Sequence, residues 1–146
     1  MIISNYMKNE HRECDTLFAK AEQAVASNEW DSAKSAFSSF RDDTLLHFNK
    51  EENELFIKFE QATGMSEGPT QVMRYEHGQM RELLSKLDEA IESRDRDGYL
   101  SIAEAMMILL QQHNMKEEQM LYAMCDRVLT AEDKESIIET IRNLSL

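Results

Sequence analysis

HFNKEENELF, residues 47–56, recurs in the chain as HNMKEEQMLY, residues 113–122. Both stretches read His, two variable residues, Lys-Glu-Glu, two more variable residues, then Leu and an aromatic residue. Residues four apart lie on one face of an α-helix, about 6 Å apart along its axis. Each stretch, if helical, therefore presents an imidazole and a carboxylate from the same face. The pairs are His47 with Glu51 and His113 with Glu117. Two such faces turned toward each other would make a metal site lined by nitrogen and oxygen.

Composition predicts a helical protein. The 146 residues include only one Pro and four Gly, and they fit a single domain, which we predict to span residues 1–146. A net charge of −12 argues against a nucleic-acid partner. No apolar run approaches the roughly 20 residues of a membrane span, and residues 1–5 do not resemble a signal peptide. Cys14 and Cys125 are isolated thiols, which favours a reducing cytoplasm.

Apolar residues at helical spacing predict an all-α fold. Four long helices are expected at about residues 4–26, 30–62, from 69 to the charged loop at 94–97, and from there to 129; a short fifth helix is expected at about 131–143. The short connections favour an antiparallel, up-down-up-down four-helix bundle spanning about residues 4–129. Asp97 and Thr130 are expected to cap the helices that follow them. Met120 and Met124 are expected to face the core.

An internal repeat places the histidines at one level of this bundle. Glu10-His11 is echoed by Glu76-His77, and 36 residues separate His11 from His47, as they separate His77 from His113. The first two helices therefore recur as the next two with a period of 66 residues. In an antiparallel bundle, equivalent positions of such a repeat lie at similar depth.

The predicted core then contains charges that must be compensated. Glu51 and Glu117 lie on apolar stripes that carry no Lys or Arg, and an unpaired buried carboxylate costs several kcal/mol. Six ligands are too many for one tetrahedral zinc, so two metal ions are expected, preferably iron, with manganese or zinc less favoured. The candidate ligands are His11, His47, Glu51, His77, His113 and Glu117. The alternative is that the histidines only form hydrogen bonds within the core. This is the more common explanation for a single buried histidine, but it does not account for four histidines with matched spacings. Asp15 is a weaker candidate, and Lys50, Glu52, Lys116 and Glu118 are predicted to lie at the surface.

The order His, His-xxx-Glu, His, His-xxx-Glu resembles the hemerythrin-like (HHE cation-binding) domain over about residues 5–129. By this resemblance, the four histidines would be terminal iron ligands. Glu51 and Glu117 would bridge two irons, with an oxo, hydroxo or water ligand completing the centre. Two positions depart from the oxygen-carrying hemerythrins. Met73 stands where those proteins have a fifth histidine, and Glu117 replaces an Asp that would stand at position 118.

Three functions remain open at this point. The first is a di-iron protein that binds or senses dioxygen or a related diatomic such as nitric oxide, or that handles iron. The second is a di-iron protein of oxidative or nitrosative stress, similar to those that repair iron–sulfur clusters; these usually carry a cysteine-containing segment ahead of the bundle, and the early position of His11 weighs against it. The third is a metal-free structural bundle. Sequence motifs of zinc proteases, phosphate loops and nucleophile elbows are absent, so whether the protein is an enzyme stays open.

Overall fold

The computed structural model describes residues 2–146 and contains only helices within that range. In chain order the elements are α1 (Ile2–Ala26), α2 (Trp30–Lys50), η1 (Glu51–Leu55), α3 (Phe56–Thr63), α4 (Pro69–Glu92), α5 (Arg96–Lys116), η2 (Glu117–Leu121), α6 (Tyr122–Val128) and α7 (Ala131–Arg142). The elements η1 and η2 are π-helical turns that join α2 to α3 and α5 to α6 without a break. The chain therefore forms four long helical segments and a short fifth, which confirms the predicted all-α class.

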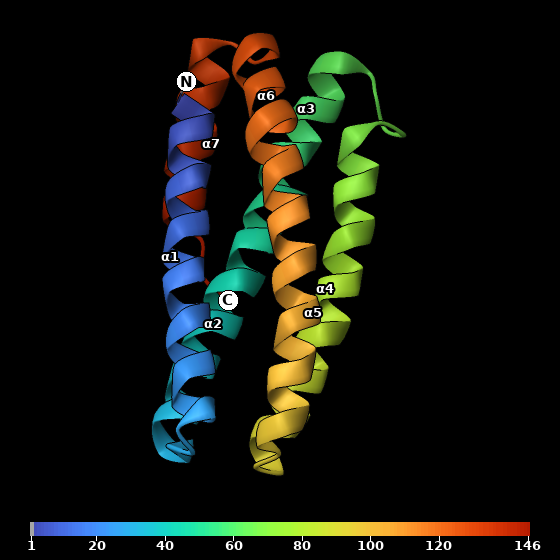
Figure 1. The fold of residues 1–146 in the computed structure, drawn as a ribbon. Coiled ribbons are helices and arrows are strands. Elements are labelled where there is room, and N and C mark those ends of the chain that lie inside the picture. The colour runs from blue at the N-terminus through green and yellow to red at the C-terminus, as the bar shows by residue number, and fades with distance from the viewer. Residues whose placement is uncertain (1) are drawn as a thin grey trace.

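The four long segments alternate in direction along the bundle (Figure 1). Helix α1 packs against α2, and α4 packs against α5; contacts of α1 with α5 and α6, and of α2 with α4, close the bundle. Helix α7 folds back at the end of the bundle near the N-terminus and contacts α1 and η1. No helix among residues 2–146 is both long enough and apolar enough to cross a membrane.

Two separate apolar clusters form the core. One lies toward the turns that join α1 to α2 and α4 to α5, and includes Phe18, Phe37, Phe40, Leu87 and Met106. The other lies beneath α7, and includes Ile3, Phe59, Leu121, Cys125 and Ile141. Along each long segment the histidine falls between the residues of the two clusters, except that Phe48, which follows His47, still belongs to the first cluster. The bundle therefore holds one polar layer between two apolar ones.

Most helix ends follow the sequence signals. Gly64 ends α3 with a left-handed backbone (φ 71°), which a glycine adopts without the steric cost of a Cβ. Thr130 caps α7, because its Oγ1 accepts a hydrogen bond of 3.0 Å from the Asp133 backbone N–H. The expectation for Asp97 was wrong. Asp95 caps α5 instead, its Oδ1 accepting from the Gly98 N–H at 3.0 Å, and Asp97 lies in the first turn.

The π-helical turns shift the inward-facing register by one residue. The Tyr122 N–H donates to the carbonyl of Glu117, five residues earlier, so the turn holds one residue more than an α-helical turn. Met120, predicted to face the core, is consequently 62% exposed, and Met124 is only partly buried. Tyr122 is fully buried in its place. The expectation for Met120 failed because it extended an unbroken α-helical period through the turn.

The cap at α5 can be tested by substitution. We expect Asp95→Ala to lower the free energy of unfolding by about 1 kcal/mol, because the Gly98 N–H loses its acceptor. Asp97→Ala is the matched control, and we expect a change of less than about 0.5 kcal/mol. Urea denaturation of the two variants measures the difference. Equal losses would contradict the assignment of Asp95 as the cap.

Candidate metal centre

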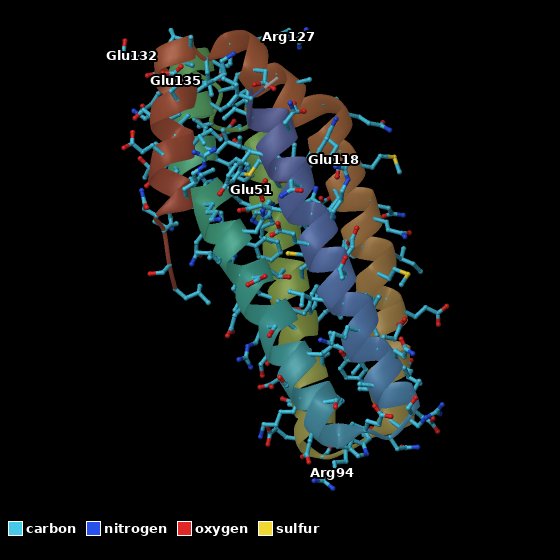
Figure 2. The ribbon with its side chains drawn as sticks, turned by 90° about the vertical axis from the view of Figure 1, so that its left-hand side faces the viewer. Glu51, Arg94, Glu118, Arg127, Glu132 and Glu135 are labelled. Atoms are coloured by element: carbon cyan, nitrogen blue, oxygen red, sulfur yellow. The ribbon has the colours of Figure 1, made fainter. Side chains whose placement is uncertain are left out.

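The polar layer brings all six predicted ligands together. Each long helical segment contributes one histidine, and the segments that contain η1 and η2 each add one glutamate. The four histidines are at most 4% exposed, and Glu51 and Glu117 are completely buried. Figure 2 shows Glu51 among the helices in the upper half of the view, at nearly the level of Glu118. The sequence repeat therefore aligned the histidines at one depth, as expected.

The donor atoms fall into two groups that share a carboxylate. Four residues, Glu51, His77, His113 and Glu117, offer one group of ligand atoms within 4.8 Å of one another. His11, His47 and Glu117 offer a second. Glu51 Oε1 is 3.3 Å from His47 Nε2 and 3.1 Å from His77 Nε2. Glu117 Oε1 is 3.2 Å from His11 Nε2 and 3.1 Å from His113 Nε2. Each central carboxylate thus lies between one histidine of each group, which suits a bridge between two metal ions.

A second layer of carboxylates orients the imidazoles. The Nδ1 of each histidine lies 2.7–2.8 Å from a glutamate oxygen: His11 pairs with Glu118, His47 with Glu10, His77 with Glu52 and His113 with Glu76. An ionised carboxylate only accepts hydrogen bonds, so each Nδ1 carries a proton and donates it. In the neutral imidazole, the Nε2 lone pair then faces the centre of the bundle, as a metal ligand must.

Cationic side chains hold three of these outer carboxylates. Lys50 donates to Glu10 and Lys116 donates to Glu76, each at 2.5 Å. Arg81 donates two hydrogen bonds of 2.9 Å to Glu52. The prediction that Lys50 and Glu52 lie at the surface was therefore wrong, because Lys50 is only 7% exposed and the Glu52 side chain only 17%. The sequence signal that was missed is the position of each outer glutamate, which repeats with the same 66-residue period as the histidines.

The fourth outer carboxylate is less constrained. Position 15 is the repeat equivalent of Arg81, and it is occupied by Asp15. This residue is exposed and belongs to neither donor group. Glu118 remains partly accessible, with 32% of its side chain exposed, although it binds His11. The two halves of the centre are thus alike in their inner donors and different in their surroundings.

Protons balance the buried carboxylates in the metal-free protein. Burial opposes charge on His11 and His113, but the nearby negative charge of Glu117 raises the pKa of both imidazoles to about 9. Burial and the neighbouring charge of Glu117 raise the pKa of Glu51. Although burial opposes its ionisation, Glu117 has a pKa well below the usual value, because His113, Glu51 and His11 stabilise its charge. The layer therefore holds protons that metal ions can replace.

Several inner atoms make no hydrogen bond, and this pattern fits a metal centre. They are Glu51 Oε1, His77 Nε2, His113 Nε2 and Glu117 Oε2. Buried polar atoms are normally paired, and each unpaired one costs roughly 1–3 kcal/mol. All four belong to the first donor group, and their lone pairs become available to a cation once it displaces the protons of the imidazoles. Imidazole nitrogen and carboxylate oxygen together suit iron, manganese or zinc.

Aromatic rings border the two donor groups differently. Phe48 stacks on His77 with ring centroids 4.0 Å apart, and Phe56 lies nearly parallel to the same imidazole at 5.9 Å. In the other half, Tyr122 lies beside His11, and its hydroxyl donates to Glu51 at 2.7 Å and to Glu117 at 3.0 Å. The sequence interpretation gave no role to these aromatic residues. The available signal was the aromatic residue that ends both ten-residue stretches.

A comparison with protein families agrees with this geometry. The model of the hemerythrin HHE cation binding domain matches residues 2–125. The chain belongs to this family. Comparison with curated proteins and with solved structures found no match. The expected family resemblance is thereby confirmed, and cation binding is the function that the family and the buried His/Glu cluster share. Met73, which we expected to stand at the position of a fifth histidine, is buried in the apolar cluster beneath α7.

The raised histidine pKa values predict how the stability of the metal-free protein depends on pH. His11 and His113 bind protons more tightly when folded than at their ordinary pKa of 6.5, so they stabilise the fold below that pH. This contribution disappears as the pH rises from 6.5 through about 9. We expect the unfolding free energy, measured with chelator present, to fall by more than about 1 kcal/mol over this range. An unchanged value would contradict the proton-balanced layer.

The outer carboxylates can be tested through metal affinity. We expect Glu52→Ala to weaken metal binding by about 10- to 100-fold, because His77 loses the acceptor that orients it. Glu54→Ala, in the same π-helical turn, is the matched control and should leave the affinity unchanged. Competition with a chromogenic chelator measures both affinities. Equal affinities of the two variants would show that Glu52 does not orient the ligand.

Proposed function

We propose that the chain is a non-haem di-iron protein whose metal pair lies in the bundle core, where it binds or senses dioxygen or a related diatomic molecule, or handles iron. The pair of donor groups that share Glu117 carries this proposal. One ion would be held by His77 and His113 and the other by His11 and His47, with Glu51 and Glu117 between them. An oxo or hydroxo bridge would complete the centre.

Charge balance supports two cations. Two fully buried carboxylates face each other in the layer, and the nearest Lys and Arg side chains bind the outer glutamates instead. Two divalent or trivalent ions would compensate Glu51 and Glu117 and would replace the protons of His11 and His113. The same ions would satisfy the four inner atoms that have no hydrogen-bond partner.

Ligand chemistry favours iron over the other candidates. Structural zinc sites are tetrahedral, are usually fully coordinated by the protein and often include cysteine. The mixed imidazole and carboxylate donors here are instead typical of iron centres with open coordination positions. Manganese could use the same donors and is the less favoured alternative. An iron pair supplies electrons for dioxygen chemistry, and open positions for a diatomic ligand.

The protein contributes a dry and rigid setting. Phe48 and Phe56 cover His77, which is itself 0% exposed, and the apolar clusters lie on both sides of the layer. Water is therefore kept from the His77 side of the centre.

The free thiols, Cys14 and Cys125, favour a cytoplasmic location.

The stress-response role is the second candidate, because an iron pair with open positions can also be oxidised irreversibly. The two roles differ in how the reduced protein responds to oxygen. A band in the visible spectrum that disappears on deoxygenation indicates reversible binding. Rapid and irreversible conversion to an oxo-bridged ferric spectrum indicates redox or stress chemistry.

The proposal is tested by counting iron in two neighbouring variants. We expect the wild-type chain, loaded anaerobically with ferrous iron, to hold two irons. Glu117→Gln should hold fewer than two, because both donor groups lose a shared ligand. Glu118→Gln should still reach about two at saturating iron, since Glu118 contacts only His11 Nδ1.

Elemental analysis after desalting gives the count, and the unfolding transition checks that both variants are folded. A wild-type chain without stoichiometric iron would overturn the di-iron proposal. Equal loss of iron from the two variants would show that Glu117 has no special role.

A further inference from the structure

One oxygen atom beside the smaller donor group does not belong to the His/Glu pattern. The first group has four protein ligands, whereas His11, His47 and Glu117 form a group of three. The hydroxyl oxygen of Tyr122 lies 3.1 Å from His11 Nε2, 3.4 Å from His47 Nε2 and 3.0 Å from Glu117 Oε1. A single phenol oxygen is therefore close to every donor atom of this group.

These distances are those of neighbouring ligands around one ion. Donor atoms that bind a first-row metal at about 2.1 Å stand about 3.0 Å apart when they are adjacent around it. Two of the three candidate donors show the same spacing, since His11 Nε2 and Glu117 Oε1 are 3.2 Å apart. The Tyr122 oxygen also lies 2.7 Å from Glu51 Oε2. A hydroxyl that only packed in the core would not need to meet four inner ligand residues at once.

We propose that the Tyr122 oxygen is a protein ligand of the metal ion held by His11, His47 and Glu117. This inference rests on the di-iron function proposed above, and it deepens the description of that site. On binding, the O–H bond breaks, a metal–oxygen bond forms, and the proton leaves to solvent; no electron is transferred. The phenolate adds a negative charge beside an ion that has two neutral imidazoles.

The internal repeat shows that only one half of the centre has such a phenol. Phe56 lies 66 residues before Tyr122 and occupies the equivalent place beside His77, where it has no oxygen to offer. The two ions would therefore differ, with one phenolate ligand for every two irons. The ion at His77 and His113 would keep the open position, on the side covered by Phe48 and Phe56.

The π-helical turn η2 positions this residue. Because the turn contains one residue more than an α-helical turn, Tyr122 faces the layer, while Met120 points to solvent. The turn η1 does the same for Phe56 in the other half. The residue that follows each π-helical turn, Phe56 or Tyr122, thus determines whether the nearby ion gains a further protein ligand.

Resonance Raman spectroscopy of the oxidised protein tests the inference. The wild-type chain is loaded anaerobically with ferrous iron and oxidised with ferricyanide, and the iron content is counted. We expect visible phenolate-to-iron charge-transfer absorption and enhanced phenolate ring modes. These modes should shift when the protein is produced with ring-deuterated tyrosine, a measurement that needs no variant.

Two substitutions then assign the ligand. Tyr122→Phe should lose the ring modes completely while the iron content stays near two per chain. Tyr99→Phe is the matched control, because Tyr99 is equally buried but lies 14 residues before His113, about 21 Å away along α5. This control should keep the modes unchanged.

The outcomes separate this inference from the proposed function. Two irons without phenolate modes in the wild-type chain, or modes that persist in Tyr122→Phe, would overturn the ligand assignment and leave the di-iron proposal intact. In that case Tyr122 would act only as a hydrogen-bond donor to the central carboxylates. Absence of bound iron from the wild-type chain would overturn both.

Discussion

Two carboxylates, Glu51 and Glu117, are completely buried between two apolar clusters, and the rest of the centre follows from the need to balance their charge. No Lys or Arg side chain forms an ion pair with either of them among the described residues. The positive charge must come from protonated imidazoles or from metal ions. The surrounding architecture keeps both possibilities available, because each Nε2 faces the carboxylates and each Nδ1 is already bonded.

The outer glutamates give the layer its rigidity. Each imidazole is held at one nitrogen by a carboxylate, and three of these carboxylates are in turn held by Lys50, Lys116 or Arg81. This arrangement places the cationic side chains outside the imidazoles, where they orient ligands without neutralising the inner carboxylates. The negative charge at the centre is therefore preserved for cations. The net charge of the chain, −12, is consistent with attraction of cations generally.

Differences between the two halves of the repeat matter as much as their similarity. The inner histidines and glutamates recur at a fixed period, and the symmetric part suits two ions of the same kind. Phe56 and Tyr122, and likewise Arg81 and Asp15, break the symmetry at equivalent positions. One half is covered by aromatic rings without polar atoms, and the other has a buried phenol and a partly exposed outer carboxylate. A pair of ions bound in such a site would therefore have chemically distinct surroundings.

The sequence by itself determined the helical class, the four-helix order and the six inner residues, because helical periodicity and the 66-residue repeat can both be read from the spacing of residues along the chain. Spacing of four between histidine and glutamate suffices to predict a shared face. The tertiary structure decided what lies around those residues. The Nδ1 partners come from neighbouring helices, so their contacts depend on how the helices pack. The π-helical turns replace the α-helical period at Glu51 and Glu117, and no pattern of apolar residues revealed them. Tyr122 was missed for this reason. Its position beside the donor atoms depends on one extra residue in a turn and on the packing of three helical segments. The spacing of residues in the sequence predicts neither of these.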